Sequence, residues 1–110
     1  VHIHPNAIVR NSIIMNDTII EEGCVIDGAI IDKNCVIGKG SIIGRGSNVC
    51  PNQEKPKVLS SGLNVIGKGV HIPEGTIIER NVRIFPHVAE TDFSDKIIAC
   101  GSTVYPAKEA

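Results

Sequence analysis

The sequence predicts an all-β domain in which short strands and tight corners alternate at a fixed spacing. Isoleucine and valine make up 30 of the 110 residues and leucine only two, whereas helical domains are usually rich in leucine and alanine. The chain has two Phe, one Tyr and no Trp, which is few for the core of a β-sandwich. Isoleucine also recurs every five or six residues, a period too short for a helical or hairpin unit.

Length and charge narrow the class of protein further. A chain of 110 residues is long enough for one domain with a modest core. A net charge of −1 provides no electrostatic basis for binding nucleic acid or an anionic membrane. The longest apolar run is four residues, Ile97–Cys100, whereas a spanning helix needs about 20. We therefore expect no nucleic-acid partner and no membrane partner.

The four cysteines do not follow a disulfide or metal-binding pattern. The chain contains no CxxC, and no secretory signal precedes the domain, so we expect a reduced, cytoplasmic setting. Cys24 and Cys35 occupy the small-residue position of the repeat, and we interpret them as core residues. Because patterned sequence already begins at Val1, we expect the chain to be an excised part of a longer protein.

Each repeat unit has an aliphatic anchor, followed four residues later by a small or β-branched partner. Gly, Asp and Asn fill the positions between units, and they tolerate the restricted backbone angles of tight corners. Units are six residues long except those that start at Ile3 and Ile26, which have five. The anchors are Ile3, Ile8, Ile14, Ile20, Ile26, Ile31, Ile37, Ile43, Ile66, Ile72, Ile78 and Ile84. Their partners are Ala7, Ser12, Thr18, Cys24, Ile30, Cys35, Ser41, Ser47, Val70, Thr76, Val82 and Val88.

The repeat divides the single domain into four segments. Residues 1–48 form the first repeat block and residues 65–89 the second. Residues 49–64 contain two Pro and a charged cluster but no repeat, so we predict a loop that leaves one corner, either functional or a tolerated surface excursion. Residues 90–110 form a tail with one strand candidate, Ile97–Cys100. We expect this tail to cap the coil, because solenoids need a terminal cap.

The repeat resembles the hexapeptide repeat of left-handed parallel β-helices, in which three units make one triangular coil. Twelve units then predict about four coils, stacked at roughly 4.8 Å. The left hand is implied by the resemblance alone, because parallel crossovers are usually right-handed. If the loop leaves and rejoins the same corner, counting in threes places one anchor of each coil on a common face: Ile14, Ile31, Ile66 and Ile84.

Two longer stretches resemble a more specific family. NSIIMNDTIIEEGCVIDGAIIDKNCVIGKG (11–40) and SGLNVIGKGVHIPEGTII (61–78) are similar to the C-terminal domain of ADP-glucose pyrophosphorylase, also called glucose-1-phosphate adenylyltransferase. The likeness extends over nearly the whole chain and includes a tail of the form DF…GSTV. It implies a parent enzyme that makes ADP-glucose and pyrophosphate from ATP and glucose 1-phosphate, with Mg²⁺, for glycogen or starch synthesis.

The resemblance also implies a division of labour within that enzyme. The catalytic domain and its Mg²⁺ lie N-terminal to this sequence, which contains neither a Gly-rich nucleotide loop nor a paired acidic metal site. We therefore expect no catalytic residue, no metal site and no cofactor in this domain. In the family, the β-helix contributes to assembly of a homo- or hetero-oligomer such as a tetramer, and to allosteric control by phosphorylated metabolites or phosphate.

Lys33 in IIDKN and Lys68 in VIGKG match effector-site positions of the family. The repeat count independently places both at corners of adjacent coils, about one strand spacing apart. Two ammonium groups that close repel each other unless an anion lies between them, and a phosphate would satisfy both. The alternative is two solvated lysines that splay apart. Arg45 and Arg80 are predicted to share a face, where they either flank this anion site or are solvated.

Three other functions remain open at this point. Hexapeptide acyltransferases commonly use a His general base near the coil, but residues 49–64 contain no His. A trimer like carbonic anhydrase would bind zinc through three His, but His71 and His87 are widely spaced and no third outward His lies nearby. The third alternative is the β-helix domain of a different sugar nucleotidyltransferase.

Overall fold

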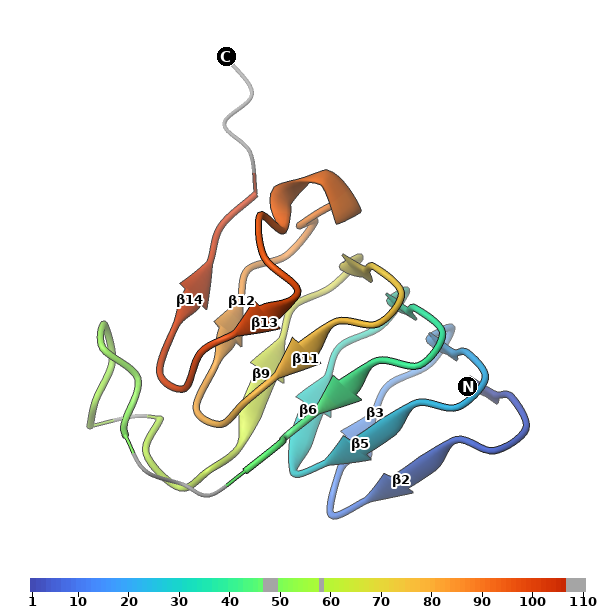
Figure 1. The fold of residues 1–110 in the computed structure, drawn as a ribbon, viewed down its shortest axis with the longest axis horizontal. Coiled ribbons are helices and arrows are strands. Elements are labelled where there is room, and N and C mark those ends of the chain that lie inside the picture. The colour runs from blue at the N-terminus through green and yellow to red at the C-terminus, as the bar shows by residue number, and fades with distance from the viewer. Residues whose placement is uncertain (47–49, 58, 107–110) are drawn as a thin grey trace.

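The computed structural model describes residues 1–46, 50–57 and 59–106. Fourteen short strands in these residues form three parallel sheets, which are the three sides of a coil. Figure 1 shows the coils stacked from the blue N-terminal one to the red C-terminal one, with the green loop projecting from the third coil. The chain is thus a parallel β-helix, as the repeat predicts.

Each sheet collects one strand from every coil. Sheet A contains β1 (His2–Ile3), β4 (Ile19–Ile20), β7 (Val36–Ile37) and β10 (His71–Ile72). Sheet B contains β2 (Ile8–Arg10), β5 (Val25–Asp27), β8 (Ile42–Ile43), β11 (Ile77–Ile78) and β13 (Ile97–Ile98). Sheet C contains β3 (Ile13–Ile14), β6 (Ala29–Ile31), β9 (Asn64–Ile66), β12 (Arg83–Ile84) and β14 (Thr103–Val104). The predicted common face of four anchors is therefore confirmed as sheet C.

Isoleucine columns fill the interior because the sheets pair in register. Ile20 aligns with Ile37, and Ile37 with Ile72, so identical β-branched side chains stack from coil to coil. Small residues pack in the corners; among them Cys24 and Cys35 are completely buried, as predicted. The anchors of the inner coils are at most 2% exposed: Ile20, Ile26, Ile31, Ile37, Ile43, Ile66, Ile72, Ile78 and Ile84.

The second anchor of the first coil was predicted one residue too early, whereas Ile3 and Ile14 align as predicted. Val9, not Ile8, aligns with the buried anchor Ile26, whereas Ile8 is 50% exposed. The short unit of this coil consequently starts at Val9 rather than Ile3, so that both short units occupy the same side of neighbouring coils. In the short unit of the second coil, the small-residue position assigned to Ile30 is filled instead by Ala29. Ala29 is buried, whereas Ile30 is only half-buried.

The tail extends the coil. β13 pairs with β11, and β14 pairs with β12, which adds two sides of a fifth coil to the four complete ones. The coil number is therefore slightly higher than predicted. A 3₁₀ turn at Glu90–Asp92 interrupts the repeat just before these strands.

The long loop leaves the coil between sheets B and C, at the corner we call the B–C corner. β8 ends at Ile43 and β9 begins at Asn64, one residue before the predicted second block. The loop therefore leaves and rejoins one corner, as expected. The predicted corner residue Ser47 and the boundary between residues 48 and 49 lie outside the described residues.

Candidate functional site

Two exposed lysines occupy neighbouring coils at the corner between sheets C and A, which we call the C–A corner. Lys33 follows β6 and Lys68 follows β9, and these strands pair in register up to Ile31 opposite Ile66. The backbone N–H of Gly69 donates to the carbonyl of Lys33 at 3.0 Å. The predicted stacking of the two lysine corners is therefore confirmed, whereas anion binding there stays a prediction.

The residues around the lysines leave this corner open to solvent. The Asp32 carboxylate accepts a hydrogen bond from the backbone N–H of Lys33 at 2.7 Å. On the coil above, the exposed His87 donates its backbone N–H to the carbonyl of Lys68 at 2.8 Å. The ion pairs found within the described residues involve neither lysine. The corner thus presents two ammonium groups that an anion in solution can reach.

The two arginines lie at a different corner from the lysines. Arg45 follows β8 and Arg80 follows β11, so both belong to the B–C corner and share a face as predicted. Arg45 Nη2 lies 2.8 Å from Glu79 Oε2, and Arg80 Nη2 lies 3.3 Å from Asp27 Oδ2. The arginines therefore do not flank the lysines, and each pairs with a carboxylate instead of being merely solvated.

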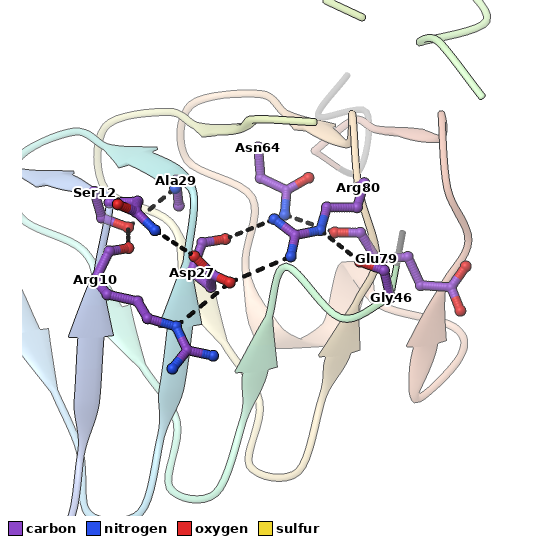
Figure 2. A network of polar contacts seen from close by, with 9 residues as sticks. Arg10, Ser12, Asp27, Ala29, Gly46, Asn64, Glu79 and Arg80 are labelled. Carbon is purple, nitrogen blue, oxygen red and sulfur yellow. Dashed lines mark hydrogen bonds and ion pairs between the residues drawn. The ribbon is translucent and has the colours of Figure 1, made fainter. Parts of the chain in front are cut away.

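Asp27 joins three coils at the B–C corner, as Figure 2 shows. Its carboxylate accepts a hydrogen bond from Asn11 Nδ2 at 3.2 Å and lies 3.5 Å from Arg10 Nε, both on the first coil. Arg80 reaches it from the fourth coil, and its Nε also donates to the carbonyl of Gly46 at 2.9 Å. The hydrogen bond from Asn11, followed by Arg80 and Arg10, holds the pKa of Asp27 below its usual value.

Two buried asparagines anchor the loop to the coil. Asn52 Nδ2 donates to the carbonyls of Asn81 and Ser102 at 3.0 and 3.2 Å, and its Oδ1 accepts two backbone N–H groups at 3.0 Å. Asn81 Oδ1 in turn accepts the N–H of Gly62, near the end of the loop, at 2.8 Å. Sequence reasoning missed both residues, because a single asparagine in a corner or a loop looks like an ordinary turn residue.

A pocket of about 380 Å³ lies between the loop and the outer face of sheet C. Its lining combines apolar side chains of both elements with two cations, and the guanidinium of Arg83 lies 4.4 Å from the centre of the Phe85 ring. The repeat pattern did not predict this pocket, because its loop wall carries no repeat. The lining residues are Ile30, Lys55, Leu59, Ser61, Leu63, Val65 and Arg83.

The described residues contain neither a cluster of metal-binding side chains nor a helix that could span a membrane. His, Cys, Asp and Glu side chains do not gather there in groups of three that could hold a metal ion. No helix in residues 1–46, 50–57 or 59–106 has the length and apolar character required to cross a membrane.

Comparison with known proteins places the chain in a family. A glucose-1-phosphate adenylyltransferase of Thermomicrobium roseum is 40% identical over 56 residues, which are 51% of this chain but only 13% of that protein. The chain thus spans a small part of this relative. No solved structure was found to match. Residues 1–66, more than half of the chain, match the family model described as GlmU-like, C-terminal hexapeptide, and the chain therefore belongs to this family of hexapeptide-repeat domains.

Proposed function

We propose that this chain is the regulatory and assembly domain of a nucleotidyltransferase that forms ADP-glucose and pyrophosphate from ATP and glucose 1-phosphate. The identity of 40% to a glucose-1-phosphate adenylyltransferase supports this activity for the parent protein. In this proposal the chemical step and its Mg²⁺ belong to a separate catalytic domain, to which the β-helix is joined. The parent is a cytoplasmic homo- or hetero-oligomer, such as a tetramer, in glycogen or starch synthesis.

We further propose that the Lys33–Lys68 corner binds phosphate or a phosphorylated metabolite that regulates the enzyme. The observation that carries this proposal is the hydrogen bond of 3.0 Å between Gly69 N–H and the Lys33 carbonyl, which holds the two corners together. Adjacent ammonium groups repel each other, and a phosphate bound between them removes the repulsion and forms charge-assisted hydrogen bonds. The corner is exposed, so a small anion needs no rearrangement of the coil to reach it.

Charge reversal in the full-length enzyme tests the effector site. We expect Lys33→Glu and Lys68→Glu each to raise the half-effective concentration of inorganic phosphate or a sugar phosphate at least tenfold, or roughly 1.4 kcal/mol. Activity without effector stays unchanged, because neither lysine lies in the catalytic domain. Lys39→Glu is the matched control, since Lys39 is an exposed corner lysine on another edge of the coil.

The two parts of the proposal can fail separately. An unchanged effector response in both lysine variants would contradict the effector site and leave the activity intact. If the full-length protein forms no ADP-glucose but makes product from another sugar 1-phosphate or nucleotide, the parent is a different sugar nucleotidyltransferase.

A further inference from the structure

We propose that Cys50 and Cys100 form a reversible disulfide that ties the long loop to the last coil of the β-helix. Cys50 lies in the loop between β8 and β9, and Cys100 lies in the turn between β13 and β14. They are 50 residues apart in the sequence, and both are present as thiols in the structure. Both thiols lie at the B–C corner, whereas the proposed effector site lies at the C–A corner.

The fold brings the two sulfur atoms together. Cys100 Sγ lies 3.3 Å from the backbone carbonyl oxygen of Cys50 and donates to it. A Cβ built on the neighbouring Gly101 would lie 3.3 Å from Cys50 Sγ, so the Cys50 sulfur faces the backbone of the turn that carries Cys100. A disulfide requires side chains that approach closely, and the hydrogen bond between the Cys50 and Cys100 side chains shows that these two thiols are direct neighbours.

Several polar contacts hold the two segments in this arrangement. Gln53 N–H donates to the carbonyl of Gly101 at 3.0 Å, and Asn52 donates to the carbonyl of Ser102 at 3.2 Å. On the other side of the turn, Glu79 Oε1 accepts the backbone N–H of Cys100 at 3.1 Å. These contacts hold the loop that carries Cys50 against the turn that carries Cys100.

The other two cysteines provide an internal contrast. Cys24 and Cys35 are completely buried at different corners, and burial raises the pKa of both thiols. Cys50 and Cys100 are only partly buried and can be reached by a small oxidant. The hydrogen bond to Cys100, partial burial, and the nearby charges of Cys100 and Glu79 raise the pKa of Cys50 to about 11. The Cys50 thiol is consequently protonated near neutral pH.

The oxidant is a low-molecular-weight disulfide such as oxidised glutathione. One cysteine thiolate attacks it, forming a mixed disulfide and releasing one glutathione thiolate. The second cysteine thiolate then attacks the protein sulfur of the mixed disulfide and releases the other glutathione. In total, two cysteine thiols and one glutathione disulfide give one protein disulfide and two glutathione thiols.

The bond would stabilise the C-terminal end of the coil, where the last strands lie at the edges of their sheets. Within residues 1–46, 50–57 and 59–106, β13 pairs with β11 alone and β14 with β12 alone, whereas inner strands pair on both sides. In a solenoid each coil is supported by its neighbours, so the terminal coil opens most readily. A bond from Cys100 to Cys50 connects the fifth coil, across the fourth, to the loop that leaves the third.

Oxidation of the full chain with a defined ratio of oxidised to reduced glutathione tests the proposal. We expect a loss of two mass units, and tryptic peptides containing Cys50 and Cys100 joined under non-reducing conditions. The melting temperature rises by roughly 10 °C and returns on reduction, because the bond closes a long loop. Amide exchange of β13 and β14 slows at least tenfold in the oxidised protein.

Matched variants separate this bond from other oxidation products. Cys50→Ser and Cys100→Ser each abolish the joined peptides and the rise in melting temperature, whereas Cys24→Ala and Cys35→Ala retain both. The proposal is overturned if Cys50 and Cys100 accumulate only as separate glutathione adducts, or if the joined peptides contain Cys24 or Cys35. It is also overturned if the bond forms but leaves the melting temperature and amide exchange unchanged.

Discussion

At the scale of single residues, Asp27 is the side chain through which distant coils contact one another. Arg80 belongs to the fourth coil but pairs with Asp27 of the second coil at 3.3 Å. This reach is possible because the chain of the third coil leaves the stack at this corner to form the long loop. The Asp27 carboxylate therefore links the second coil to the fourth at the corner where the loop leaves the third coil.

Removal of this carboxylate tests that role. We expect Asp27→Ala to lower the free energy of unfolding by about 2 kcal/mol, because two arginines and Asn11 lose a charged acceptor. Urea unfolding measures the change. Arg10→Ala is the control, since that side chain is 60% exposed and its pair contributes at most about 1 kcal/mol. A cost for Asp27→Ala no larger than for Arg10→Ala would contradict the role.

The same carboxylate makes stability depend on acid pH. The folded-state pKa of Asp27 is lowered, so its contribution is complete above the unfolded value near 3.9 and is lost as pH falls through the folded value. Asp27→Asn should remove this part of the pH dependence. Between pH 7 and 9, the free energy of unfolding of this variant should change with pH in the same way as that of the unmodified chain. If the free energy of unfolding of Asp27→Asn still falls at acid pH as steeply as that of the unmodified chain, Asp27 is not the source of this pH dependence.

Gly44 shows the steric limit at the same corner. Its φ is +93°, and a Cβ there would lie 2.0 Å from the Asp27 carbonyl oxygen. We expect Gly44→Ala to cost about 3 kcal/mol or more in urea unfolding, because backbone must move. Gly40→Ala is the control, since Gly40 also has a positive φ but no atom within 4 Å of the added Cβ. Its cost should stay near 1 kcal/mol, and equal costs would contradict the steric argument.

At the scale of elements, the period of six predicts the strands and the core but leaves the register ambiguous wherever two aliphatic residues are adjacent. Ile8 and Val9 satisfy the pattern equally, and only pairing with the next coil selects Val9 opposite Ile26. The last two strands also follow the period of six, since Ile98 and Val104 are six residues apart. The 3₁₀ turn at Glu90–Asp92 separates them from the repeat and hides that continuity.

Some of the candidate sites could likewise be predicted from the spacing of the anchors, and others could not. The stacking of Lys33 on Lys68 could be predicted, because backbone register in a coil follows directly from the spacing of anchors. The Asn52 anchor and the Cys50–Cys100 contact could not, because they depend on how a loop without a repeat folds back onto the coil. The partners of Asn52 on the coil lie 29 to 51 residues away in the sequence, and no local pattern records them.

The loop's attachment to the coil depends on one buried amide. Asn52→Ala leaves the backbone groups that Asn52 satisfies without partners, so we expect a loss of about 2–4 kcal/mol and proteolytic cleavage within residues 50–63. Limited proteolysis and urea unfolding measure the two effects. Gln53→Ala is the control, because Gln53 is exposed and contacts the coil through its backbone. Equal cleavage of both variants would show that Asn52 does not anchor the loop.

At the scale of the whole molecule, stability is distributed unevenly along the coil. An inner coil is covered on both sides, and its anchors are almost completely buried. Among the described residues, the first coil has a neighbour on one side only, and there Ile3, which aligns with the buried Ile20, is 49% exposed. Because each coil is stabilised through its neighbours, the same side chain contributes more in the middle than at the end.

Truncation of equivalent anchors measures this gradient. Ile37 and Ile3 belong to the same sheet, and we expect Ile37→Ala to cost about 3–4 kcal/mol, because a buried cavity opens between two coils. Ile3→Ala should cost about 1 kcal/mol or less, since water already reaches half of that side chain. Urea unfolding at several protein concentrations gives both values. Equal costs that depend on concentration would mean that a second copy covers the first coil, whereas equal costs at all concentrations would contradict stabilisation by neighbouring coils.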